Sequence, residues 1–188
     1  MRVVAGLAGR TTLVAPKGMD TRPTSDMAKE NLFNILAPHV RGARFLDLFC
    51  GSGAIGIEAL SRGAQEAVFV ESAKPALTAT KQNLEKTKLL PLADILTVPV
   101  QRAIDLLSDE KRCFDIIFLD PPYETELLIQ TLKHLSKTNL LVPDGIIIAE
   151  TDAKFNDISG APREFVLIDK RLYGRTCFLF YKWAVTAA

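Results

Sequence analysis

The middle of the chain alternates short apolar runs with longer stretches of helical periodicity. Runs such as RFLDLF, EAVFVE and FDIIFLD are each followed by an amphipathic segment. Short apolar runs with helices between them are typical of parallel strands that are buried on both faces. The pattern therefore predicts an α/β fold with a doubly wound, Rossmann-like sheet that is mostly parallel.

The two ends of the chain break this alternation. Residues 163–183 contain two apolar runs joined by Tyr173-Gly174 without a helix, which predicts a hairpin whose last strand enters the sheet antiparallel. At the start, RVVAG and TTLV flank a glycine-containing turn and predict a β-hairpin. The length of 188 residues suits one domain. We expect a single domain with an N-terminal hairpin and helix extension (1–43) and a core (44–188).

The extension should contain one amphipathic helix. Its apolar positions run from about Asp26 to Leu36, and Ser25 or Thr24 can cap its first turn. Pro38 follows directly, and proline usually lies beyond a helix end. The sequence therefore predicts a helix that ends before Pro38.

A glycine-rich motif follows the first core strand. Gly51-Ser52-Gly53-Ala54-Ile55-Gly56 matches GxGxxG, and Glu71 lies at the end of the next strand. By spacing alone this is a dinucleotide site. However, Asp47 ends the strand directly under the glycines, where its charge would oppose a pyrophosphate. S-adenosylmethionine (SAM) has no phosphate and carries a positive sulfonium and ammonium, so the motif favours SAM over NAD.

Other polar residues should gather where the strands end. Ligands of doubly wound sheets bind beyond the carboxyl ends of the strands. Glu71 can accept hydrogen bonds from both ribose hydroxyls, and Phe49 either lines the site or packs in the core. The residues predicted to bind the cofactor are Asp47, Phe49, Gly51, Ser52, Gly53, Glu71 and Asp120.

The fourth core strand ends in Asp120, Pro121, Pro122 and Tyr123, which we predict to be catalytic. An exocyclic amine of a nucleobase is a poor nucleophile, because its lone pair is delocalised into the ring. The Asp120 carboxylate and the Pro121 carbonyl can each accept one N–H and turn the lone pair toward a methyl group. The Tyr123 ring can stack on the base. Asp120 can also take the released proton.

The cysteines and apolar runs exclude some other classes of protein. Cys50, Cys113 and Cys177 are far apart and form no CxxC pair, so we expect neither a metal site nor a disulfide framework. No apolar run reaches the ~18 residues of a membrane helix, and MRVVAGLAGR lacks the apolar core of a secretory signal. We therefore expect a cytoplasmic protein.

The chain resembles the RsmD-type 16S ribosomal RNA guanine-N2 methyltransferases over nearly its whole length. The matching segments are Gly9-Arg10, RPTSDMAKENLFNIL (22–36), LDLFCGSGAIGIEALSRGA (46–64), FVE (69–71), DPPY (120–123) and RLYGRT (171–176). The resemblance implies the class I SAM-dependent methyltransferase fold. It also implies SAM as the donor and a guanine of small-subunit rRNA as the acceptor, within an assembled particle. Three positions depart from the family pattern.

The departures concern Met27, Cys50 and Gln101. The family has a basic residue where Met27 stands and alanine where Cys50 stands. After the third strand it has an acidic or amide residue that would recognise the adenine amine, and this chain reads Val100-Gln101. We expect the Gln101 backbone or side chain to substitute for that contact.

Charge suggests where RNA would bind. Residues 1–44 carry 7 basic and 3 acidic side chains, residues 163–182 carry 5 and 2, and the rest of the chain is acidic. Such asymmetry can mark a nucleic-acid surface or ordinary solvated side chains. We predict phosphate contacts from Arg10, Arg22, Lys170, Arg171 and Arg175. Adenine-N6 methylation of DNA or RNA stays open, since DPPY serves it equally, as do an NAD-dependent oxidoreductase and a binding module without turnover.

Overall fold

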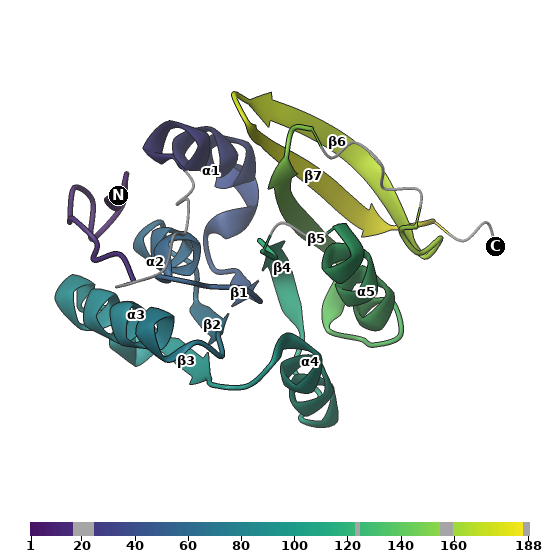
Figure 1. Cartoon of the computed structure of the whole chain (residues 1–188), viewed down its shortest axis with the longest axis horizontal. Coiled ribbons are helices and arrows are strands. Elements are labelled where there is room, and N and C mark those ends of the chain that lie inside the picture. Colours follow the sequence, from purple (N-terminus) through teal and green to yellow (C-terminus); the bar gives the residue numbers. More distant parts are fainter. Residues whose placement is uncertain (17–24, 123–124, 155–159, 186–188) are drawn as a thin grey trace.

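The computed structural model describes residues 1–16, 25–122, 125–154 and 160–185 of the chain. Its centre is a seven-stranded sheet with the order β3-β2-β1-β4-β5-β7-β6 (Figure 1). The strands are β1 (Arg44–Asp47), β2 (Glu66–Val70), β3 (Ala93–Leu96), β4 (Phe114–Leu119), β5 (Leu141–Asp152), β6 (Phe165–Tyr173) and β7 (Thr176–Trp183).

Strands β1 to β5 are parallel, and β7 pairs antiparallel with both β5 and β6. The expected doubly wound sheet with an antiparallel last strand is confirmed. The turn between β6 and β7 contains Gly174 at φ 62°, a left-handed conformation that favours glycine. Because Thr176 pairs with Asp152, this turn lies at the carboxyl edge of the parallel strands.

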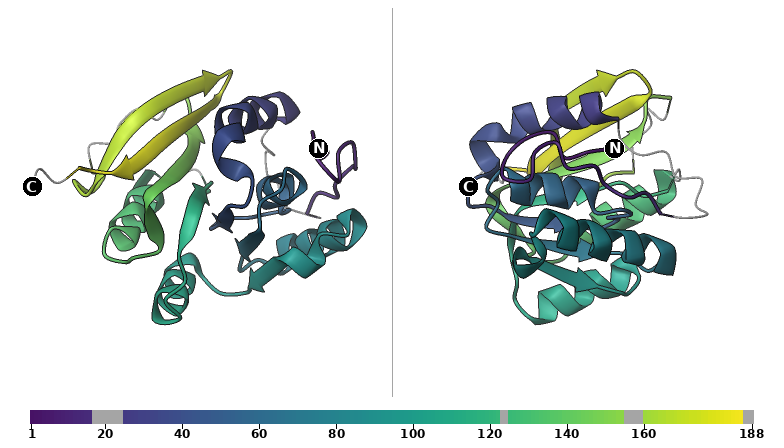
Figure 2. Two further views of the ribbon diagram at one scale, coloured as in Figure 1. Left: turned by 180° about the vertical axis from the view of Figure 1, so that it is seen from behind. Right: turned by 90° about the vertical axis from the view of Figure 1, so that its left-hand side faces the viewer.

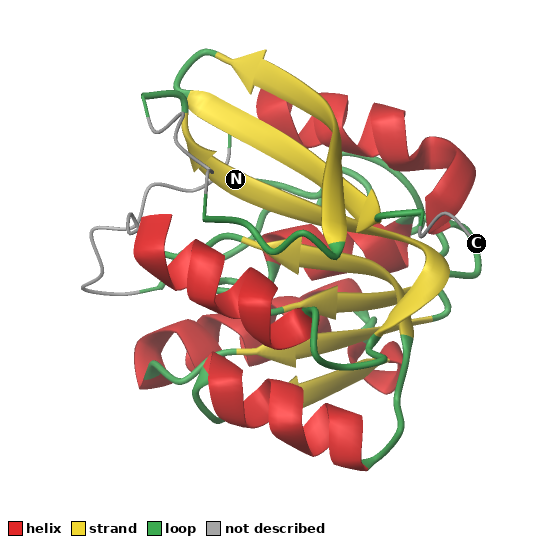
Figure 3. Ribbon diagram, turned by 90° about the vertical axis from the view of Figure 1, so that its right-hand side faces the viewer, coloured by secondary structure: helices red, strands yellow, loops and turns green. Residues whose placement is uncertain are grey.

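Helices cover both faces of the sheet (Figures 2 and 3). Helices α1 (Asp26–Val40), α2 (Ala54–Ser61) and α3 (Lys74–Thr87) contribute to one core. Helices α4 (Val100–Asp109) and α5 (Thr125–Leu135) contribute to the other. A short 3₁₀ helix, η1 (Leu90–Leu92), precedes β3. No helix among the described residues is long and apolar enough to cross a membrane.

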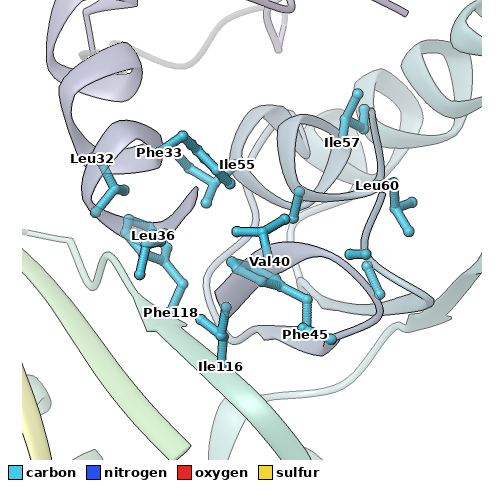
Figure 4. Packing of buried hydrophobic residues seen from close by; sticks show 14 of the residues in the cluster. Leu32, Phe33, Leu36, Val40, Phe45, Ile55, Ile57, Leu60, Ile116 and Phe118 are labelled. Atoms are coloured by element: carbon cyan, nitrogen blue, oxygen red, sulfur yellow. The ribbon is translucent and has the colours of Figure 1, made fainter. Parts of the chain in front are cut away.

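The first core joins the N-terminal helix to the sheet (Figure 4). Its apolar side chains from α1, α2, β1 and β4 are buried, and they include Leu32, Phe33, Leu36, Val40, Phe45, Ile55, Ile57, Leu60, Ile116 and Phe118. Burial of an apolar side chain of this size stabilises a fold by roughly 1.5–3 kcal/mol. The extension therefore packs on the core as an integral part of it.

Two local predictions in the extension need correction. Helix α1 continues through Pro38 to Val40, so the expected end before Pro38 was wrong. Pro38 lies in the last turn, where its missing N–H removes the hydrogen bond to the carbonyl four residues earlier, and the buried Val40 holds that turn against the core. The cap was correct, because the Ser25 side chain accepts from Ala28 N at 3.1 Å.

The predicted N-terminal hairpin is short and irregular, with one antiparallel bridge between Arg2 and Thr12. Backbone bonds from Val3 N to Thr11 O (2.9 Å), Arg10 N to Val3 O (2.8 Å) and Leu13 N to Met1 O (3.1 Å) join its two arms, and side chains of α2 bond it to the core. Val4 N and Ala5 N donate to the Glu58 carboxylate at 2.7 and 3.0 Å. We call residues 1–14 the N-terminal loop.

Candidate active site

Four carboxylates end four neighbouring strand segments of the sheet. Asp47, Glu71 and Asp120 lie at or directly after the ends of β1, β2 and β4, and Glu150 follows the last residue of β5 that pairs with β4. Because these strands are parallel, their carboxyl ends meet at one side of the sheet. We call this set the acidic edge.

The glycine loop, residues 50–53, lies beside the acidic edge. Gly51 and Gly53 have φ of 54° and 77°, left-handed conformations that strain other residues. A Cβ atom on Gly51 would meet nothing within 4 Å, so its backbone faces open space from which a ligand can approach. A Cβ on Gly56 would lie 2.3 Å from the Phe69 ring, so this glycine lets α2 pack closely on β2.

Glu71 fixes the glycine loop to the start of α3. One carboxylate oxygen accepts from Gly51 N at 3.1 Å, and the other accepts from Ser72 N and Ala73 N at 2.9 and 2.8 Å. Each carboxylate oxygen can accept more than one hydrogen bond. The predicted contact of Glu71 with ribose hydroxyls is compatible with this geometry and stays a prediction.

Asp47 is buried beneath the glycine loop with only 1% of its surface exposed. Its Oδ2 atom accepts from Gly56 N at 3.2 Å, whereas Oδ1 is buried and has no hydrogen-bond partner among the described residues. Burial, and then the nearby Glu71 and Glu150 charges, raise the pKa of Asp47 from 3.8 to about 7. A buried carboxylate with an orphaned oxygen suits a cationic ligand and opposes a phosphate.

Asp120 and Glu150 make the edge more acidic still. Leu119 pairs with Ala149, so the two carboxylates directly follow the last paired residues of β4 and β5. Burial, and then the Glu150 and Asp47 charges, raise the pKa of Asp120 well above its ordinary value. The Thr176 hydroxyl lies 3.5 Å from Glu150, which joins β7 to the edge.

Sequence analysis assigned Glu150 no role. The signal was available, because Glu150 follows the apolar run of β5 as Asp120 follows that of β4. Pro121 is half-buried and Pro122 is exposed beyond that strand end. Tyr123, the fourth predicted catalytic residue, lies outside the described residues.

The remaining predicted cofactor residues take different places. Phe49 is half-buried and packs against the core on the α4 and α5 face. Ser52 is half-buried, and its hydroxyl lies 3.4 Å from the Met1 sulfur. Gln101 is exposed in the first turn of α4, beyond the connection that follows β3. Its contact with a cofactor stays a prediction.

Basic residues of the C-terminal hairpin lie near the acidic edge and already have acidic partners. Arg171 pairs with Asp169 at 2.8 Å, and Arg175 lies 3.5 Å from Asp152. More than half of each arginine side chain remains exposed. Lys170 lies in the same strand, β6.

The N-terminal basic residues are distributed differently. Arg10 is exposed in the N-terminal loop, and its N–H donates to Val3 O at 2.8 Å. The loop tip is bonded to Ser61, in the last turn of α2, which is the end remote from the glycine loop. Arg22 lies outside the described residues. Contact of these groups with RNA stays a prediction.

The sheet order, the antiparallel last strand and the glycine loop define a Rossmann-like methyltransferase fold. The family model described as conserved hypothetical protein 95 matches residues 1–182. The chain belongs to this family, which contains the RsmD-type proteins that the sequence resembles.

Two relatives and one solved structure show how closely the chain follows known proteins. YlbH of Bacillus subtilis strain 168, provisionally named an rRNA methyltransferase, is 37% identical over 97% of this chain and 98% of its own. Ribosomal RNA small subunit methyltransferase D of Escherichia coli K12 is 31% identical over 97% and 89%. The structure of yhhF from Escherichia coli, provisionally described as a methyltransferase, superposes with a TM-score of 0.86. It is 26% identical, with 99% of both chains covered.

Proposed function

We propose that the protein transfers a methyl group from SAM to the exocyclic N2 amine of a guanine in small-subunit rRNA. The observation that carries this proposal is the acidic edge beside an open glycine loop. Burial and neighbouring negative charges, including that of Glu150, raise the pKa of Asp47 and Asp120, and a bound cation would offset this cost of ionisation. The sulfonium and ammonium of SAM supply positive charge of this kind.

The residues of the chain would hold the cofactor from two sides. Asp47 and its neighbours would face the positive groups, and Glu71 would accept from the ribose hydroxyls beside the Gly51 backbone. When bound, SAM supplies a methyl group that the sulfonium has already activated. NAD fits poorly, because its pyrophosphate would lie next to a buried carboxylate.

Asp120 and Pro121 would orient the acceptor amine. With one N–H donated to each oxygen, the nitrogen lone pair points at the methyl carbon, and the new N–C bond forms as the S–C bond breaks onto sulfur. The amine's proton then passes to Asp120, directly or through water. A carboxylate with a raised pKa is a good proton acceptor. Positioning supplies most of the acceleration in such an in-line transfer.

The rRNA substrate is supported by the names of the relatives, and guanine by the resemblance of the N-terminal block at 22–36. Adenine N6 is the second candidate, since DPPY can hold either amine. Mass mapping of nucleosides in 16S rRNA separates the two. A deletion strain should lose one N2-methylguanosine, and wild-type protein should restore it. Loss of an N6-methyladenosine, or no loss, would contradict the guanine assignment.

A further inference from the structure

Asn83 connects two segments that are remote in sequence. It lies on α3, and its side chain is fully buried. Its Nδ2 group donates to Ser52 O in the glycine loop at 2.9 Å and to Val14 O in the N-terminal loop at 3.0 Å. Its Oδ1 atom accepts from Val14 N at 2.7 Å. One amide therefore bonds both polar groups of Val14 and the back of the glycine loop.

Neighbouring side chains strengthen this connection from both sides. Thr80, one turn earlier on α3, donates to Gly51 O at 2.8 Å. Lys86, one turn later, donates to Thr12 O at 2.6 Å. The Met1 sulfur accepts from the Ser52 hydroxyl at 3.4 Å. One stripe of α3 therefore holds the two loops against each other.

These bonds determine which way the glycine loop faces. In a trans peptide the C=O and N–H groups point in opposite directions. Because Thr80 holds the Gly51 carbonyl toward α3, the Ser52 N–H must point away from α3. The loop also has open space beside Gly51, where a Cβ would meet nothing within 4 Å.

We propose that Asn83 is a positioning residue through which the N-terminal loop sets the cofactor affinity of the glycine loop. Asn83 acts from behind the loop and touches no ligand. The inference rests on the cofactor part of the proposed function. It assigns residues 1–14 a role in cofactor binding that is separate from any contact with RNA.

The test is calorimetric titration of full-length protein with S-adenosylhomocysteine. Asn83→Ala should weaken binding by about tenfold or more, since two loop carbonyls and one N–H lose buried partners. Val14→Pro, which removes the N–H that reaches Asn83 and also fixes φ at position 14, should weaken it in the same direction. With RNA substrate, the KM for SAM should rise in both variants, while kcat at saturating SAM changes less than about twofold.

Two control variants separate positioning from general destabilisation. Gln82→Ala changes an exposed neighbour on α3, and Val14→Ala keeps the backbone N–H. Both should stay within about twofold of wild type. Urea unfolding identifies the folded fraction of each variant, and Val14→Pro keeps the test open if Asn83→Ala fails to fold.

The outcomes also distinguish this inference from the proposed function. Unchanged affinity in Asn83→Ala and Val14→Pro, with normal binding by wild type, would overturn the positioning role and leave the cofactor assignment standing. A fall in kcat at saturating SAM with an unchanged KM would overturn it as well. Absence of binding by the wild-type protein would overturn both.

Discussion

Glu58 and Asp47 are both almost fully buried carboxylates, one on α2 and the other bonded to it, yet their surroundings differ. Glu58 accepts from Arg62 Nε at 2.7 Å and from two backbone N–H groups, and Lys29 lies 3.6 Å away. Asp47 has one orphaned oxygen within the described part of the chain and two acidic neighbours. The paired carboxylate of Glu58 fastens the N-terminal loop to α2, whereas Asp47 lies among other negative charges.

The difference lies in whether the protein itself compensates a buried charge. Burial of a charge is costly unless partners compensate it. In the Glu58 cluster the compensation comes from the protein, including the Lys29 ammonium, which also donates to Arg2 O. At the acidic edge, burial and neighbouring carboxylates instead raise the pKa of Asp47 and Asp120. A perturbed pKa in such a cluster marks a candidate functional site.

The largest expected effect is on catalysis at Asp120. Asp120→Ala should lower methyl transfer by about 10²–10⁴, because the amine loses an orienting group and a proton acceptor. Asp120→Asn should be less affected, because an amide oxygen can still accept one N–H. Single-turnover kinetics with saturating SAM measures both, and Asp144→Ala, an exposed carboxylate of β5, is the control. Wild-type turnover by Asp120→Ala would leave Asp120 with a structural role only.

Glu58→Ala should mainly affect stability. Removal of one partner of a buried charge cluster costs about 3–5 kcal/mol, because Lys29 is left without its buried counter-charge. Burial already lowers the pKa of Lys29. Urea unfolding should show the loss, with the exposed Glu30→Ala as control. A change below about 1 kcal/mol would show that the cluster is not what fastens the N-terminal loop.

Asp47→Asn should change stability and SAM affinity in opposite directions. The pKa of Asp47 in the folded protein, about 7, lies above the ordinary 3.8. Protonated Asp47 therefore contributes its full stabilisation to the free protein below about pH 4, and this contribution is lost as pH rises through 7. At pH 8 the variant should therefore be more stable than wild type, by on the order of 3 kcal/mol. Its affinity for SAM should be lower, because a negative charge is lost.

Two measurements check the behaviour of Asp47. Urea unfolding between pH 5 and 8 should show wild type and Asp47→Asn converging toward low pH. SAM affinity of wild type should rise with pH up to about 8, and that of the variant should depend on pH less. Equal stability at pH 8 would mean that the Asp47 charge is compensated in the free protein.

Local sequence patterns predicted most of the fold and the position of the acidic edge. The strand and helix alternation, the C-terminal hairpin and the glycine motif are all short-range signals, and each is present in the structure. The acidic edge followed from one rule, that parallel strands end at the same side of a sheet. The sequence alone therefore predicted that Asp47 lies next to the glycine loop.

The parts that were not predicted depend on contacts between distant residues. Glu58 bonds a backbone 54 positions away, and Asn83 bonds Val14 over 69 positions. No periodicity signals either contact, and a buried glutamate or asparagine reads as a surface residue of an amphipathic helix. The N-terminal hairpin was predicted too regular for the same reason, because the N–H groups of Val4 and Ala5 bond to Glu58 of α2, whereas those of Val3 and Leu13 bond across the hairpin.

The smallest expected effect concerns the basic residues around the acidic edge. RNA is repelled by the acidic edge itself, so phosphate contacts must come from outside it. Arg171→Ala and Arg175→Ala should weaken RNA binding on any sequence and reduce the salt dependence by about one unit of log–log slope or less. Arg10→Ala tests the N-terminal loop in the same way.

The ion pairs of the hairpin sharpen this last test. Arg171 is held by Asp169, so Asp169→Asn should free the guanidinium and strengthen RNA binding, most clearly at low salt. Lys137→Ala is the matched control, because this exposed lysine precedes β5 and lies toward the opposite side of the sheet. Filter binding across a salt series measures every variant. Unchanged slopes in all the arginine variants, with no gain in Asp169→Asn, would mean that these residues are ordinary solvated surface. The charge that attracts RNA would then lie elsewhere than the hairpin and the N-terminal loop.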